Sequence, residues 1–548
     1  MHTTHKERFS LILAFALVVA LTIVPLAGGA RMVEDLMLVT TGPNGTGGNN
    51  DSERPMLSAD GSTIVFSSYA SDLIDGFTPN GHSQIYSYDI ATETFTLITK
   101  GDGSGGNADS AMPVVSVDGT KIAFYSVASN LIPGAPAIGS ENIYLYDALT
   151  DTVRMVSKPT VEVSGDARYL SMSADGSTVA YQAKFLDGEY FDRIQVIRYD
   201  VATDTSQVIS RNSLGVLGDN ESGTSDVSAD GSRIVFLSKA HNLVEGITTG
   251  DQYYLWDETA GLSCISTTPT GAASDNSLTW RQPSISSDGT RIAFVANATN
   301  LVSPAANGND NAFLWNESAG ITLITIGSSG VGGNGGTKGV ALSPDGTLAG
   351  VVSYATDLVG GMTTNTQDNV FLYTLADNSV ELITQGADGI GGNNESNRPC
   401  VLSMGPNRMM TFHSEASDLI DGLDVNGGLN GEGSIRQVYL WGRVQLLTVT
   451  YDAQNSTTPA TTEVFWGDTA PVPTQPTKKG FEFAGWWTAP DGGTLWDFTD
   501  PVTADMTLYA HWTPVKDGLP PTGDALSLMA PALLALGALV VNEGRKRR

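Results

Sequence analysis

A ten-residue pattern recurs at a nearly constant interval through most of this 548-residue chain. Its clearest copy runs from Leu57 to Phe66 and places Asp60-Gly61 between two apolar runs. The Asp residues of the six clear copies are 55 to 58 residues apart, namely Asp60, Asp118, Asp175, Asp230, Asp288 and Asp345. A seventh, degraded copy lies between Ser403 and Phe412 and contains one extra residue. A fixed period of this size indicates a repeat architecture.

Each copy has the sequence of four short strands. Asp-Gly between apolar runs favours a tight hairpin, because Gly, and at a smaller cost Asp, adopts positive φ. The run after this turn, as at 64–66, is β-branched or aromatic, and a Tyr-rich run and a fourth strand follow, as at 85–89 and 95–99. Four strands per repeat and seven repeats predict an all-β chain with a seven-bladed β-propeller over residues 31–445.

The pattern Ser-x-Asp-Gly-x-x-[Ile/Val]-Ala-Phe, followed by Tyr-x-Tyr-Asp, resembles the PD40 repeats of TolB-like propellers. The resemblance covers about 400 residues, from Asp35 to roughly Val449, and it implies a fold rather than an activity. We interpret Asp60 and its equivalents as turn formers and not as catalytic groups. The Asp-box of sialidases needs a Trp after the turn, where these copies carry aliphatic residues.

An unpaired strand precedes the first repeat. Residues 35–42 copy the fourth strand of a blade, and the loop 45–55 reads like the loop 389–399. The seventh repeat has its third strand at 437–441 and no fourth strand of its own. We therefore expect the N-terminal strand to pair with Val438–Trp441 and to close the last blade, which removes an open sheet edge.

The period ends near Leu446, and aromatic residues then cluster up to 514. The order Val-Thr-Tyr-Asp-Ala, Pro-Thr-x-x-Gly-Phe-x-Phe-x-Gly-Trp and Leu-Tyr-Ala-x-Trp resembles the Listeria–Bacteroides repeat. That resemblance implies a small β-grasp-like module of the kind found in internalin B-type surface proteins. Its aromatic residues are interpreted as a compact core, with a sugar-stacking site as the alternative.

The first 30 residues read as a secretory signal, because Lys6 and Arg8 precede the apolar run Phe9–Leu26 and small residues follow it. A permanent N-terminal membrane anchor is the alternative. The chain carries a formal charge of −30, which disfavours nucleic acid and anionic lipid as partners.

Residues 515–548 resemble a sortase sorting signal. Here Leu519, Pro520, Pro521, Thr522 and Gly523 precede an apolar stretch at 526–541 and a basic tail. The resemblance implies that a sortase thiol attacks the carbonyl of Thr522, that Gly523 leaves, and that a peptidoglycan amine resolves the acyl-enzyme. The apolar stretch would then be a transient membrane segment, and a plain tail anchor is the alternative.

No catalytic or metal motif is evident in the sequence. Cys264 and Cys400 fall in different repeats, no Cys/His spacing suits a metal, and no Gly-x-Ser-x-Gly elbow occurs. We expect no cofactor and no disulfide. Carboxylates that converge across a propeller are invisible in a sequence, so a glycosidase stays open.

The loops sort by face. The Asp-Gly turn and the third-to-fourth turn share one end of each blade, while the second-to-third loops and the blade connectors share the opposite, long-loop end. The third repeat departs from the rest, with a shorter loop containing Tyr190 and Phe191. We expect these two side chains to contact a ligand, and the alternative is that they pack under the neighbouring loop.

Together these features predict a monomeric, exported protein of a Gram-positive bacterium, attached covalently to the cell wall. Its partners would be sortase, peptidoglycan and an extracellular glycan or protein bound by the propeller. The rival functions are a propeller-type hydrolase acting on polysaccharide and a spacer without a ligand.

Overall fold

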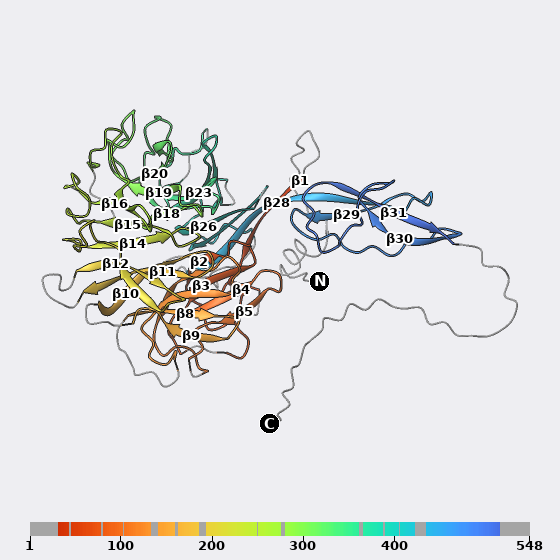
Figure 1. Ribbon diagram of the computed structural model, residues 1–548, viewed down its shortest axis with the longest axis horizontal. Helices are drawn as coiled ribbons and strands as arrows, with labels where there is room; N and C mark the ends of the chain where they lie inside the picture. The colour runs from red at the N-terminus through yellow and green to blue at the C-terminus, as the bar shows by residue number, and fades with distance from the viewer. Residues whose placement is uncertain are drawn as a thin grey trace, which may run out of the picture. The chain divides into compact units, whose positions relative to one another are not determined.

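The computed structural model describes residues 31–42, 45–77, 80–101, 103–132, 141–158, 163–185, 193–248, 250–275, 280–360, 365–386, 389–404, 406–421 and 435–515 (Figure 1). These residues divide into two compact units. The first is the repeat region up to Leu447 with Glu463–Asp468, and the second contains Thr448–Thr462 and the chain from Thr469 onward.

Six four-stranded antiparallel sheets make up most of the first unit, and each contains four consecutive strands. The first three sheets are β2–β5 (Ser52–Leu57, Thr63–Ser68, Gln84–Asp89, Thr94–Leu97), β6–β9 (Ser110–Val115, Lys121–Ser126, Asn142–Asp147, Thr152–Met155) and β10–β13 (Val163–Met172, Thr178–Phe185, Ile194–Asp200, Thr205–Val208). The next three are β14–β17 (Ser222–Val227, Arg233–Ser238, Gln252–Asp257, Gly261–Cys264), β18–β21 (Ser284–Ile285, Arg291–Ala296, Asn311–Asn316, Gly320–Leu323) and β22–β25 (Thr337–Leu342, Leu348–Ser353, Asn369–Thr374, Ser379–Leu382).

The prediction of seven blades is wrong, because among the described strands six sheets are four-stranded blades. The last repeat instead belongs to a seven-stranded sheet. Its strands are β26 (Ser396–Met404), β27 (Asn407–Ser414), β28 (Gln437–Asp452), β1 (Arg31–Leu38), β29 (Ala460–Phe465), β30 (Phe481–Trp487) and β31 (Met506–Pro514). The physical reason is the length of β28. No turn follows Trp441, so this strand runs on for 16 residues and also pairs with β29 and, in parallel, with β31.

The predicted pairing of the N-terminal strand is confirmed. β1 lies antiparallel to β28, with Leu36 opposite Trp441 and Leu38 opposite Tyr439. Gln437 fixes the end of this pairing, because its Oε1 accepts the Thr40 hydroxyl at 2.6 Å and its Nε2 donates to the Gly48 carbonyl at 2.8 Å. The first blade repeats this arrangement internally, where Thr99 donates to Gln84 at 2.7 Å.

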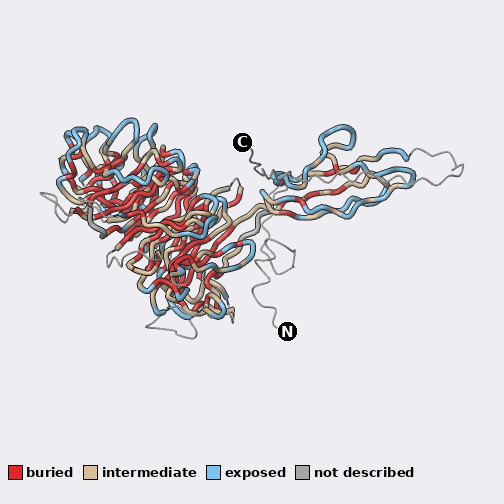
Figure 2. Tube along the Cα trace, turned by 60° about the horizontal axis from the view of Figure 1, so that its bottom comes forward, coloured by how far each residue is buried: buried red, intermediate tan, exposed pale blue. Residues whose placement is uncertain are grey.

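The six blades and β26–β28 form a ring with the first strand of each sheet innermost. β26 packs against both β22 and β2, so the last repeat lies beside the first. Hydrophobic clusters fill the spaces between adjacent sheets, and buried residues follow the strands while exposed residues concentrate in the loops (Figure 2). Stacked aromatic pairs recur at matching positions, as in Phe66–Tyr86 and Phe124–Tyr144, both with ring centroids 5.8 Å apart.

The Asp-Gly motifs form the predicted turns between the first and second strands. In the first blade, Asp60 Oδ1 accepts hydrogen bonds from the Ser58 hydroxyl at 2.6 Å and from the Ser62 backbone N–H at 2.9 Å. The backbone N–H of Ser232 is the main reason why the pKa of Asp230, an equivalent residue, lies below its usual value. The interpretation of these residues as turn formers is confirmed.

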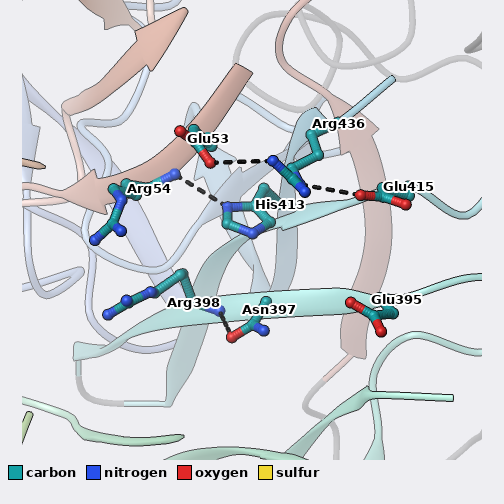
Figure 3. A pocket seen from close by; sticks show the side chains of 8 residues that line it. All are labelled: Glu53, Arg54, Glu395, Asn397, Arg398, His413, Glu415 and Arg436. Carbon is teal, nitrogen blue, oxygen red and sulfur yellow. Dashed lines mark hydrogen bonds and ion pairs between the residues drawn. The ribbon is translucent and has the colours of Figure 1, made fainter. Parts of the chain in front are cut away.

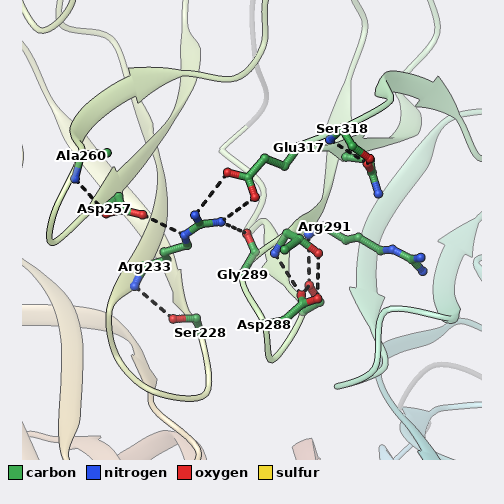
Figure 4. A network of polar contacts seen from close by, with 12 residues as sticks. Ser228, Arg233, Asp257, Ala260, Asp288, Gly289, Arg291, Glu317 and Ser318 are labelled. Atoms are coloured by element: carbon green, nitrogen blue, oxygen red, sulfur yellow. Dashed lines mark hydrogen bonds and ion pairs between the residues drawn. The ribbon is translucent and has the colours of Figure 1, made fainter.

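Arg233 joins two neighbouring blades (Figure 4). Its Nε lies 2.8 Å from Asp257 Oδ2 in its own blade. Its Nη1 lies 3.1 Å from Glu317 Oε2 and 3.3 Å from the Gly289 carbonyl oxygen in the next blade. This network fixes adjacent sheets at the turn end of the ring.

The second unit has an aromatic core, as expected. Trp486 is 5% exposed and contacts Tyr451 and Phe483 edge-on, with centroid distances of 5.3 and 5.7 Å. Trp512 Nε1 donates to the Ala453 carbonyl at 2.9 Å. These contacts favour the core interpretation over a sugar-stacking site for these rings.

Candidate functional site

A central channel of about 390 Å³ runs between the innermost strands of the ring. Every sheet of the repeat region contributes to its wall, through β2, β6, β10, β14, β18, β22 and β26 or the residues just before them. The middle of the wall is apolar and includes Met56, Met172 and Leu402. This volume lies within the range of about 300–1,000 Å³ that is typical of small-molecule sites.

At the turn end, backbone hydrogen bonds link successive Asp-Gly turns around the channel. The donor and acceptor pairs are Asp60 N to Val117 O (3.0 Å), Val117 N to Ala174 O (2.7 Å), Ala174 N to Ala229 O (3.0 Å), Ala229 N to Ser287 O (3.0 Å) and Ser287 N to Pro344 O (2.7 Å). The series ends at Pro344, which has no N–H to donate. Small side chains and linked backbone leave few side-chain functional groups at this end.

The long-loop end is different, because four cationic residues line the channel there: Arg54, Arg281, Lys338 and Arg398. Arg54 and Arg398 lie near the starts of β2 and β26 and share a positive φ of 56°. The antiparallel register shifts at both places, between Glu53 and Met56 and between Asn397 and Cys400. Bulges of this kind redirect side chains next to binding sites.

Among the described residues, no ion pair involves Arg54, Arg281, Lys338 or Arg398. Carboxylates outside the channel wall still act on these cations, because the charge of Glu53 acts to raise the pKa of Arg398, and the charges of Lys338 and Arg281 act to lower that of Asp368. Lys338 Nζ lies over the Tyr354 ring, 5.5 Å from its centroid. Enclosure by the protein, together with the neighbouring Arg54 charge, lowers the pKa of Arg398 to about 10. Arg398 is nevertheless reached by solvent through the channel, so it stays charged at neutral pH.

Asp226 is the one carboxylate among the described residues that line the channel. One of its oxygens accepts the Val227 backbone N–H at 3.0 Å, and the other accepts the Ile285 N–H at 2.9 Å. Enclosure by the channel wall raises the pKa of Asp226 to about 7, although the two hydrogen bonds act in the opposite direction. Asp226 therefore links two strands and neutralises little of the cationic charge.

A smaller pocket of about 240 Å³ opens between β2, β26 and β27 (Figure 3). Three of its charged residues are paired, because Arg436 Nε lies 3.0 Å from Glu415 Oε1 and Arg436 Nη1 lies 3.5 Å from Glu53 Oε2. Arg54 and Arg398 also line this pocket, and Figure 3 shows both side chains extending to the same side of it.

His413 lies at the centre of that pocket and is 8% exposed. Its Nδ1 accepts the Arg54 backbone N–H at 3.0 Å, which connects β27 of the last repeat to β2 of the first. Burial lowers the pKa of His413 to about 3, and the charges of Arg398, Arg436 and Arg54 act in the same direction. The imidazole is therefore neutral and carries its proton on Nε2.

Polar atoms without partners lie on the opposite arc of the channel. Ser171 of β10 and Thr224 of β14 line it, and their hydroxyl oxygens are buried without a hydrogen-bond partner among the described residues. On the cationic side, Arg281 Nε also lacks a partner among the described residues. Unsatisfied buried polar atoms are rare in native proteins, and a missing ligand or water commonly accounts for them.

The site residues predicted from the sequence are not among those that line the channel or the smaller pocket. Tyr190 and Phe191 lie outside the described residues, as do Leu519, Pro520, Pro521, Thr522 and Gly523 and the signal segment 1–30. The channel cations were not predicted. A signal for two of them exists, because the loops 45–55 and 389–399 are similar in sequence and each ends in an Arg-Pro pair, at 54–55 and 398–399.

No helix in the described part of the chain is long and apolar enough to span a membrane. No group of three or more His, Cys, Asp or Glu side chains within it is arranged to hold a metal ion.

Comparison with known sequences identifies the C-terminal module. Residues 448–511 match the Listeria-Bacteroides repeat domain, which confirms the expected resemblance. The chain is 58% identical over 43 residues to Internalin H of Listeria monocytogenes, which is 8% of either protein. It is 33% identical over 76 residues to a putative Gly-rich membrane protein of Evansella cellulosilytica, 14% of this chain and 9% of that protein. The matches thus span less than a tenth of each relative.

Comparison with solved structures finds similarities at low sequence identity. TolB from Acinetobacter baumannii is 14% identical with a TM-score of 0.34, over 61% of this chain and 64% of that one. The propeller domain of the Trilobed protease from Pyrococcus furiosus is 11% identical with a TM-score of 0.41, over 72% and 94%. An oligogalacturonate lyase from Vibrio parahaemolyticus is 13% identical with a TM-score of 0.43, over 76% and 98%. These likenesses concern the fold alone.

Proposed function

We propose that this chain is a surface-displayed binding protein whose propeller takes up an extracellular ligand through the long-loop end of its central channel. The observation that carries this proposal is a channel of about 390 Å³ with unpaired cations at that end. A concave site with a few convergent polar groups is the usual form of a ligand site. The match to the Listeria-Bacteroides repeat domain and the short similarity to Internalin H support display at the cell surface.

A hydrolase is the weaker candidate. Glycoside hydrolysis uses two carboxyl groups about 5–10 Å apart with distinct protonation states. In the described channel wall Asp226 stands without a second carboxylate, and both of its oxygens already accept backbone hydrogen bonds. Glu53 and Glu415 of the adjoining pocket pair with Arg436. Binding is therefore the function that the described groups support better.

A blocked channel tests the proposal. The full-length protein is screened against glycan and host-protein arrays. The screen is repeated with Met56→Trp, whose larger side chain should obstruct the channel. Leu149→Trp is the matched control, because Leu149 is 77% exposed in the turn between β8 and β9. We expect Met56→Trp to abolish binding and Leu149→Trp to retain it. Retention by both variants, with both still folded, would refute the channel as the site.

Attachment to the cell wall belongs to the same proposal. The Leu519–Gly523 sequence and the apolar and basic segments after it support cleavage by a sortase between Thr522 and Gly523. We expect mass spectrometry of muramidase-released protein to identify Thr522 as the C-terminal residue, joined to a peptidoglycan fragment. Recovery of the intact segment 523–548 in wall-bound protein would contradict covalent attachment.

A further inference from the structure

The charge in the channel is opposite to the charge of the molecule. The chain carries −30 overall, yet the channel wall combines four cations with one carboxylate whose oxygens are occupied. Like charges brought together in an enclosed space cost free energy unless an anion neutralises them. Arg281, Lys338, Arg398 and Arg54 come from sheets that follow one another around the ring, so they form one continuous cationic arc.

The opposite arc carries no cation among the channel-lining residues, and its one carboxyl group is that of Asp226. It contains the buried hydroxyl groups of Ser171 and Thr224, which lack partners among the described residues, and the half-buried ring of Tyr169. Trp280 also lines the channel, with Lys239 Nζ 4.9 Å from the centroid of its ring. A ligand that satisfies both arcs needs anionic groups on one side and hydroxyl groups with a flat apolar face on the other.

The size of the channel limits the ligand further. A folded protein partner cannot enter 390 Å³, but a few sugar residues or the end of a chain can. Arg is the side chain best suited to recognise a carboxylate, because its guanidinium offers two parallel N–H groups. The paired bulges place two such groups, Arg54 and Arg398, on the same side of the adjoining pocket (Figure 3).

We infer that the channel binds the end of an acidic oligosaccharide, with a uronate carboxylate held by Arg54 and Arg398 and sugar hydroxyls facing Ser171 and Thr224. This inference rests on the proposed binding function and names the class of its ligand.

The test uses isothermal titration calorimetry on the full-length protein. The probes are a glucuronate-containing trisaccharide, its methyl ester, which keeps the hydroxyls and removes the charge, and a triglutamate peptide, which keeps the charge and removes the sugar. We expect the uronate to bind and both other probes to bind at least tenfold more weakly. The variant Arg54→Gln/Arg398→Gln should lose at least tenfold in affinity for the uronate.

The matched control is Lys158→Gln/Lys479→Gln, which removes two exposed cations outside the channel and should leave the affinity unchanged. Equal binding of the peptide, or of the ester, would overturn an acidic sugar as the ligand. If no uronate binds but an array ligand still depends on an open channel, this inference fails while the proposed function stands. If Met56→Trp leaves every ligand bound, the proposed function itself fails.

Discussion

The pKa values of Asp226 and His413 are shifted in opposite directions, upwards for the carboxyl group in the channel wall and downwards for the buried imidazole. The pKa of Asp226 is raised from 3.8 to about 7 by enclosure, so between these values the folded protein binds more protons than the unfolded chain. The pKa of His413 is lowered from 6.5 to about 3 by burial, so between these values the unfolded chain binds more protons. By linkage, stability falls with rising pH in the first case and rises in the second. From about pH 4 to 6.5 the two contributions oppose each other.

Replacing Asp226 leaves the contribution of His413 to the pH dependence of stability unopposed by that carboxyl group. In Asp226→Asn the side-chain oxygen still accepts one backbone hydrogen bond, but the titration is lost. We expect the free energy of unfolding of this variant to fall more steeply than that of the wild type as the pH is lowered from 6.5 to 4. Urea unfolding at several pH values measures it, and a slope identical to that of the wild type would contradict the assignment.

Replacing His413 leaves the contribution of Asp226 to the pH dependence of stability unopposed by that imidazole. We expect the free energy of unfolding of His413→Gln to fall less steeply than that of the wild type as the pH is lowered from 6.5 towards 4, because the buried imidazole, which favours unfolding in acid, is gone. His241→Gln is the control, because His241 lies on an exposed loop of another blade. The same denaturation series measures the slope, and a slope equal to that of the wild type would rule out a contribution from His413.

At the scale of elements, β1 and β28 hold the two ends of the repeat region together. Leu38 is 5% exposed and packs in a cluster with Trp441, Tyr439 and Phe412. Deleting β1 would leave an unpaired edge on β28 and uncover this cluster.

We expect Leu38→Ala to lower the free energy of unfolding by about 2–5 kcal/mol, the usual cost of such a truncation in a core. Leu149→Ala, the same change at an exposed site, should cost little. Chemical denaturation compares the two. If the two substitutions have equal effects, β1 does not contribute to the core as described.

Much of this architecture follows from local sequence. The Asp-Gly turns are recognisable because few residues adopt the positive φ that such turns need. The similar loops at 45–55 and 389–399 correctly identified β1 as the missing fourth strand. The seven-stranded sheet could not be predicted from the sequence, because no local sequence signal shows how far β28 continues in the absence of a turn. The channel cations did not follow either. Their direction depends on bulges at Arg54 and Arg398, and their convergence depends on ring closure between residues more than 300 positions apart in sequence.

At the scale of the whole molecule, the net charge of −30 and the cationic channel act over different distances. The screening length is about 30 Å at 0.01 M salt and about 8 Å at 0.15 M, so the negative surface repels an anionic ligand over a long range only at low salt. The channel cations act within contact distance, where screening is weaker. The molecule therefore opposes the approach of the ligand that the channel itself attracts.

This difference predicts an unusual salt dependence. We expect the association rate constant of the glucuronate trisaccharide to rise between about 0.01 and 0.15 M salt, because screening removes the long-range repulsion. The dissociation rate constant should rise as well, because salt competes with the contacts to Arg54 and Arg398 once they have formed. Stopped-flow measurements separate the two rates. In Arg54→Gln/Arg398→Gln the association rate should keep the same salt trend, since the surface charge is unchanged outside the channel. An association rate that falls steadily with salt would mean that attraction by the channel reaches beyond its mouth. Long-range repulsion by the negative surface would then not control the approach of the ligand.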